Sequence, residues 1–149
     1  MLVKSLQDQA RFRAAITYHA GMLAVLWPWC YTATVTQDDA AFFTASQKAA
    51  QAMGATTFEQ SSQDVITTGE YIDYAYMKHE TLAITMEVSE QKTSSGDAVA
   101  SIADGSRKGS LAYFQAIYQL NSNLLPLERQ DYVHRGTSRS TFDCRRRCE

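Results

Sequence analysis

The sequence has few of the residues that cross-link, kink or anchor a protein chain. Its 149 residues include three cysteines and two prolines, and the three cysteines make no disulfide framework. Cys144 and Cys148 stand among arginines with only His134 nearby, so a zinc site at this pair is not expected. The apolar run that begins at Met22 stops at Pro28 and is too short to span a bilayer. The sequence therefore predicts neither a disulfide scaffold nor a membrane partner.

An excess of one charge is also missing. The formal net charge of −2 gives no general reason to expect nucleic acid or an anionic membrane as a partner. Residues 1–20 lack the apolar core of a signal peptide, because Lys4, Asp8, Arg11 and Arg13 interrupt them. The remaining composition, 45% hydrophobic and 20% charged, is that of an ordinary globular domain with one core.

The pattern of apolar residues predicts an alternation of strands and helices. Strands are expected where apolar and polar residues alternate or form a short apolar run, at residues 12–19, 22–27 and 81–88. Helices are expected where the spacing is helical, at residues 1–11, 36–53, 70–77 and 98–121. The polar segment 55–70 is predicted to be a loop. Both faces of strand 81–88 are largely apolar, which favours an α/β sheet covered by helices on each face.

Individual residues in the two longer predicted helices indicate where one begins and ends and where the other is weakened. Thr36 is expected to cap the helix at 36–53, and Gly54 to end it. The helix at 98–121 is expected to be weakened by Gly105 and Gly109. The residues predicted for its buried side are Leu111, Phe114, Ile117, Tyr118 and Leu120.

Two polar residues stand at the ends of predicted strands. His19 is the last residue of strand 12–19, and Glu87 lies near the end of strand 81–88. Ligands of open α/β sheets bind outside the carboxyl ends of the strands, so the two positions indicate one shared site. The alternatives are a Glu87 that simply reaches water and a His19–Glu87 pair that is satisfied within the core.

Tyrosines are concentrated in the predicted helix at 70–77. Tyr71, Tyr74 and Tyr76 are dense enough to line a pocket, although ordinary packing is the alternative. His79, in the polar connection after this helix, is expected to lie on the surface.

The C-terminal residues have a different character. We predict a domain over residues 1–126 and a basic, disordered tail over 127–149, since residues 134–149 carry five arginines and little apolar content. An arm that binds nucleic acid is an alternative for a short basic tail, but such a tail alone is weak evidence for it.

Three segments carry a resemblance to a known family. His19, followed nine residues later by Pro28 between two tryptophans, is similar to a strand with a zinc-binding histidine and an aromatic-proline-aromatic turn. Segment 69–76, Gly-Glu-Tyr-Ile-Asp-Tyr-Ala-Tyr, resembles Gly-x-Ser-x-Asp-Trp-x-Tyr, and segment 85–88, Thr-Met-Glu-Val, resembles Thr-Phe-Glu-Leu. In this order and spacing, over residues 12–120, they resemble the C-terminal half of a zinc carboxypeptidase of the carboxypeptidase A type, peptidase family M14.

The resemblance implies a fold, a chemistry and roles for five residues. It implies a mixed, mostly parallel sheet with helices on both faces, and a metallocarboxypeptidase that removes C-terminal residues from peptides or proteins with one zinc ion. His19 would be a zinc ligand, and Glu87 the general base. Ile72 would set a preference for apolar C-terminal side chains, which Glu70 would extend towards basic ones. Tyr71 would replace a mobile tyrosine of the family.

The chain departs from the family at its start. The first two zinc ligands of the family come from a His-x-x-Glu motif in the N-terminal half, and this sequence contains no such motif. The position of the mobile tyrosine is held by Val65. Met1 is therefore expected to be an internal start, and the chain alone to be inactive. A non-catalytic peptide-binding module and a purely structural half-domain are the alternatives.

Overall fold

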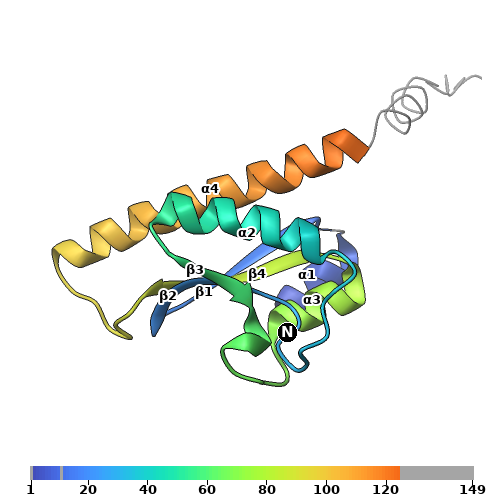
Figure 1. Cartoon of the computed structure of the whole chain (residues 1–149), viewed down its shortest axis with the longest axis horizontal. Helices are drawn as coiled ribbons and strands as arrows, with labels where there is room; N and C mark the ends of the chain where they lie inside the picture. The colour runs from blue at the N-terminus through green and yellow to red at the C-terminus, as the bar shows by residue number, and fades with distance from the viewer. Residues whose placement is uncertain (1, 11, 125–149) are drawn as a thin grey trace, which may run out of the picture.

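The fold of the chain, taken from a computed structural model, is described for residues 2–10 and 12–124. A sheet lies between two layers of helices, with α2 and α4 on one face and α1 and α3 on the other (Figure 1). The elements in chain order are α1 (Leu2–Gln9), β1 (Ala14–His19), β2 (Met22–Trp27), α2 (Asp39–Met53), β3 (Thr57–Gln60), the short 3-10 helix η1 (Ser61–Gln63), α3 (Tyr71–His79), β4 (Leu82–Ser89) and α4 (Asp97–Leu124). The predicted tail at 127–149 and the boundary at 126 lie outside the described residues.

The sheet has four strands in the order β1-β4-β2-β3. The pairs β1–β4 and β2–β3 are parallel, and the central pair β2–β4 is antiparallel. The predicted α/β class, a mixed and mostly parallel sheet with helices on both faces, is therefore confirmed. Among the strands that the structure describes, β1 and β3 form the two edges.

The predicted loop at 55–70 is wrong at its start, where β3 extends the sheet beyond β2. Thr57 pairs with Ala24 and Gln60 with Trp27, and η1 follows directly. A four-residue edge strand is too short to show alternation, and its conformation depends on pairing with β2. The strands predicted at 12–19, 22–27 and 81–88 are confirmed to within two residues.

The start of α2 is fixed by tertiary contacts and not by the expected cap. The prediction that Thr36 caps this helix is wrong: Asp38 is the N-cap residue and makes no side-chain cap hydrogen bond. The Tyr76 hydroxyl instead donates to Asp38 Oδ2 at 2.9 Å, and Trp27 Nε1 donates to Asp39 Oδ1 at 3.0 Å. Gly54 ends the helix as predicted, in the left-handed conformation at φ 83°.

The buried side of α4 differs from the predicted one. Of the five residues predicted, Ile117 is buried and Leu120 is partly buried, but Leu111, Phe114 and Tyr118 are exposed. The two glycines decide the orientation, because they let α2 approach α4 closely. A Cβ atom at Gly109 would lie 3.2 Å from the Ala49 carbonyl oxygen and 3.1 Å from Met53 Cβ. The helix therefore turns Gly105, Gly109, Tyr113 and Ala116 towards α2 and the sheet.

The main core lies between the sheet and the pair α2–α4. Its largest buried members come from β2, α2, β4 and α4, and include Val25, Phe42, Ile84, Met86 and Tyr113. Within the described ranges, no helix has both the length and the apolarity needed to cross a membrane.

The close contact of α4 with α2 can be tested by substitution. We expect Gly109→Val to lower the free energy of unfolding by about 1–3 kcal/mol, because overpacking a closed contact costs this much. Urea denaturation measures the change. The matched control, Ala103→Val, places the same side chain on an exposed position of the same helix. Equal stability of the two variants would contradict the close crossing.

Candidate active site

His19 and Glu87 meet at the carboxyl ends of two adjacent parallel strands. The register of β1 and β4 pairs residue 19 with residue 87, and His19 Nδ1 lies 3.6 Å from Glu87 Oε1. This is an ion-pair distance, longer than a hydrogen bond. The His19 side chain is 52% exposed, and that of Glu87 is 14% exposed. The two side chains that the sequence placed at strand ends therefore share one site.

The register that brings them together is held by contacts along the two strands. Leu82 N donates to the Arg13 carbonyl at 2.9 Å where the strands begin to pair. The hydroxyl groups of Thr17 and Thr85 are 2.9 Å apart, one side-chain step before His19 and Glu87 on the same face. This pair fixes the strands directly beneath the site.

The environment of Glu87 favours its protonated form. Burial raises the pKa of the Glu87 carboxyl, the neighbouring His19 lowers it, and Asp64 raises it again. The Oε2 atom is buried and has no hydrogen-bond partner among the described residues. An unpaired buried carboxylate oxygen is costly, so this group is a good acceptor for a proton or for a donor group of a ligand.

Three residues at this site were not singled out from the sequence. Thr17 and Thr85 each precede a predicted site residue by two positions, so their matching place in the two strands was a usable signal. Asp64 follows η1, inside the segment predicted to be a loop, and gave no such signal. Its approach to Glu87 depends on the turn after β3.

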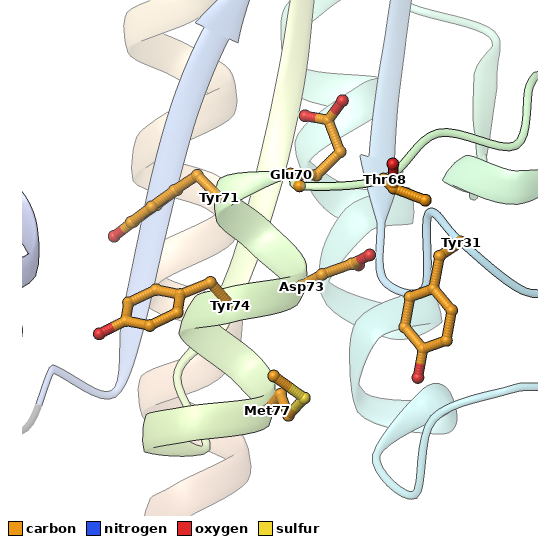
Figure 2. A pocket seen from close by; sticks show the side chains of 8 residues that line it. Tyr31, Thr68, Glu70, Tyr71, Asp73, Tyr74 and Met77 are labelled. Atoms are coloured by element: carbon orange, nitrogen blue, oxygen red, sulfur yellow. The ribbon is translucent and has the colours of Figure 1, made fainter.

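A pocket of about 570 Å³ is lined by residues of α3, by the residues just before this helix and by Tyr31 of the loop after β2 (Figure 2). Two of the residues predicted to bind substrate, Glu70 and Tyr71, line it. The third, Ile72, is 2% exposed and packs in a buried cluster that contains Cys30 and Ala83. The lining residues are Tyr31, Thr68, Gly69, Glu70, Tyr71, Asp73, Tyr74 and Met77.

The tyrosines of α3 divide between this pocket and the core. Tyr71 and Tyr74 line the pocket, whereas Tyr76 is buried and bonds to Asp38. The expectation that His79 lies on the surface is wrong. Its side chain is 12% exposed, with Nε2 3.3 Å from the Tyr74 hydroxyl and 3.4 Å from Asp8 Oδ1.

Hydrogen bonds with Asp73 of α3 and Gln60 of β3 hold the loop after β2 in place. The Cys30 amide donates to Asp73 Oδ1 at 2.9 Å and to Oδ2 at 3.2 Å. Gln60 Nε2 lies within hydrogen-bonding distance of the carbonyls of Trp29, Thr32 and Thr34. Burial raises the pKa of the Cys30 thiol to about 12, which keeps it protonated and unreactive. The Tyr31 wall of the pocket is therefore fixed from two sides.

The described residues do not by themselves fit a zinc ion. A catalytic zinc site takes three protein ligands, but residues 2–10 and 12–124 contain no group of three His, Cys, Asp or Glu side chains that could hold a metal. His19 offers one imidazole, with Glu87 beside it. Any zinc site that uses His19 needs further ligands.

The raised pKa of Glu87 makes stability depend on pH. The unfolded carboxyl titrates near pH 4.5 and the folded one at a higher pH. Its contribution to stability is therefore fully present below pH 4.5 and is lost as the pH rises through the folded pKa. A glutamine at position 87 cannot ionise, so the Glu87→Gln chain does not lose this stability. We therefore expect its free energy of unfolding to rise relative to that of the unmodified chain between pH 4 and 7. Urea denaturation across this range measures it, with the exposed Glu90→Gln as control. A constant difference would contradict the burial of Glu87.

Comparisons with known proteins identify the family and the fold of the chain. The zinc carboxypeptidase family model, peptidase M14, matches residues 1–120. Carboxypeptidase A from Helicoverpa armigera has the same fold at a TM-score of 0.68 and 12% identity, over 78% of this chain and 33% of that protein. Thrombin-activatable fibrinolysis inhibitor has the same fold at a TM-score of 0.68 and 13% identity, over 78% of this chain and 34% of that protein. No curated protein matches the sequence.

A third solved structure extends the likeness. Bovine thrombin-activatable fibrinolysis inhibitor, in complex with tick carboxypeptidase inhibitor, matches at a TM-score of 0.62 and 15% identity, over 82% of this chain and 44% of that protein. The chain thus spans less than half the length of the three solved proteins. Because the family match covers most of its residues, the chain belongs to the zinc carboxypeptidase family.

Proposed function

We propose that this chain supplies the general base and one zinc ligand of a metallocarboxypeptidase that removes C-terminal residues from peptides. In this assignment Glu87 is the base and His19 the ligand. The observation that carries it is their meeting at 3.6 Å on adjacent parallel strand ends. Membership of the zinc carboxypeptidase family supports the reaction class.

Glu87 has the properties of a general base. A carboxylate beside the last peptide bond accepts a proton from the water whose oxygen attacks the carbonyl carbon. The same proton then passes to the amine as the carbon–nitrogen bond breaks. A base works best when its pKa lies near the working pH, and burial moves the pKa of Glu87 upward in that direction.

The proposed activity needs zinc ligands in addition to those that residues 2–10 and 12–124 provide. A zinc ion needs ligands that residues 2–10 and 12–124 do not supply together. The exposed half of the His19 side chain leaves room for such ligands to approach from the edge of the sheet. They would come from a longer form of the polypeptide or from a second polypeptide.

We assign Glu70 and Tyr71 to the side chain of the bound peptide. Both line the pocket beside α3, where Glu70 precedes the first turn of the helix and Tyr71 opens it (Figure 2). Ile72 supports this surface from behind, in the buried cluster with Cys30 and Ala83. This pocket would favour peptides with an apolar C-terminal side chain, and Glu70 would also allow a basic one.

A second candidate is a half-domain that binds peptide without hydrolysing it. Two observations favour it. The pocket at α3 does not include His19 or Glu87 in its lining, and the described part of the chain has no third metal ligand. Binding of a peptide therefore does not require the catalytic pair.

The test uses the complete reading frame that contains residues 1–149. We expect its transcript to encode a His-x-x-Glu motif upstream, and the translated protein to release C-terminal residues from synthetic peptides. Glu87→Gln is expected to lower kcat/KM by about 10²–10⁴-fold, the usual contribution of a general base. His19→Ala is expected to lower zinc content as well.

Glu90→Gln, an exposed position with no part in the proposed chemistry, is the matched control. Unchanged hydrolysis by the Glu87→Gln protein would overturn the assignment of the base. Peptide binding with no hydrolysis by the complete protein would support the second candidate.

A further inference from the structure

The two edges of the described sheet differ in how they are protected. β3 is four residues long and includes Glu59, whereas β1 is six residues long and has no charged residue from Ala14 to Tyr18. β1 pairs with β4 in continuous register, so no bulge turns it away from a neighbouring strand. Short strands, charges and bulges are the usual means by which an edge avoids pairing with another chain. Of the two edges in the described sheet, β1 is therefore the one that can accept a further strand.

Exposed apolar side chains of α4 lie beside this edge. Leu111, Phe114 and Tyr118 follow helical spacing and form a stripe along α4. The Tyr18 hydroxyl of β1 lies 2.6 Å from Ser110 Oγ, and Phe114 follows Ser110 by one helical turn on the side towards β1. The three side chains of the stripe and that of Tyr18 are between 44% and 63% exposed. Residues 14–18 of β1 and this stripe therefore form one continuous surface, which we call the β1–α4 surface.

The distribution of charge allows the β1–α4 surface to meet a copy of itself. The charged residues of α4 all lie within residues 97–108, and residues 109–124 contain none. A two-fold interface sets the same patch of two subunits together, so a charge on the patch approaches its own copy. An apolar patch without charges avoids this repulsion and is stabilised by leaving water. A second copy of the chain is therefore an occupant that fits this surface.

Antiparallel pairing is the arrangement that a two-fold axis produces at this edge. Residues directly opposite each other in an antiparallel pair point to the same face of the sheet. Pairing centred on Ile16 sets Tyr18 opposite Ala14 of the second copy, a large side chain against a small one. Helix α4 of each copy then lies on the same face of the joined sheet, where the two stripes meet.

The surface is large enough for a specific contact. An aromatic side chain buries about 150–250 Å², so Tyr18, Phe114 and Tyr118, each about half exposed, contribute roughly 100 Å² each. With Leu111, the exposed side chains supply roughly 400 Å² per copy and roughly 800 Å² per pair. The edges of the two strands bring this area towards the ~1,200 Å² at which specific interfaces begin.

We propose that the chain forms a homodimer in which β1 pairs antiparallel with β1 of a second copy and the two α4 stripes pack together. Two four-stranded sheets then become one sheet of eight strands. The inference goes beyond the proposed hydrolysis, and it has a consequence for the metal site. The edge that the second copy occupies is the edge from which further zinc ligands would approach His19, so the dimer and a zinc-loaded site exclude each other.

Sedimentation equilibrium of the full chain, from low micromolar to submillimolar concentration, tests the dimer. A reducing agent prevents cross-links through Cys144 and Cys148. We expect the mass to rise from the 16.6 kDa of one chain to twice this value and to stop there, because a two-fold contact closes on itself. Hydrogen exchange at both ends of the range locates the contact. The β1 amides that do not bond to β4 are expected to exchange more slowly in the dimer.

Three variants assign the interface to the β1–α4 surface. Phe114→Glu sets a charge within the stripe against its own copy, and we expect it to raise the dissociation constant by about 30-fold or more. Tyr18→Lys adds a charge beside the strand edge and is expected to act in the same direction. The matched control is Val99→Glu, at a half-exposed apolar position of the same helix before the stripe, and it is expected to change nothing. Thermal melts followed by circular dichroism separate loss of the dimer from loss of the fold, and hydrogen exchange of the unmodified chain needs no variant.

Four outcomes would overturn the proposal. The first is a monomer at every concentration with rapid exchange along β1. The second is a monomer with slow exchange at the same amides, which would assign the edge to another segment of the same chain. The third is a mass that keeps growing beyond two copies. The fourth is a dimer with equal dissociation constants for folded Phe114→Glu and Val99→Glu chains. None of these readings uses zinc or hydrolysis, so failure here leaves the proposed function untouched.

Discussion

The parallel pairing of β1 with β4 is the interaction on which the site depends. It sets residue 19 opposite residue 87 and places both at the carboxyl ends of their strands. A shift of the register by one residue would turn His19 to the opposite face from Glu87, because side chains alternate along a strand. The Thr17–Thr85 contact and the Leu82–Arg13 backbone hydrogen bond oppose such a shift.

The two faces of this sheet serve different purposes. Helices α2 and α4 cover one face and contribute most of the buried apolar side chains, helped by the close approach at Gly109. The other face carries His19, Glu87 and the smaller cluster around Cys30, and α3 borders it with a pocket of tyrosines and carboxylates. Stability therefore comes mainly from one side of the sheet and candidate chemistry from the other.

Elements with a local signal could be predicted from the sequence, whereas most contacts between distant segments could not. Alternation placed β1, β2 and β4, and strand ends brought His19 and Glu87 together. The pairing that creates β3, the bonds that start α2 and the glycine contact that orients α4 depend on distant residues. Asp64 near Glu87 and the burial of Ile72 followed from the same long-range packing, which no single segment encodes.

The electrostatic contact between His19 and Glu87 is the central claim, and carbon-13 NMR of the Glu87 carboxyl tests it most directly. Titration of the unmodified chain should give a Glu87 pKa above its ordinary value of 4.5, because the group is buried. The His19→Gln chain should give a still higher pKa, because the imidazole lowers it. A Glu87 pKa that does not change when His19 is replaced would contradict the contact.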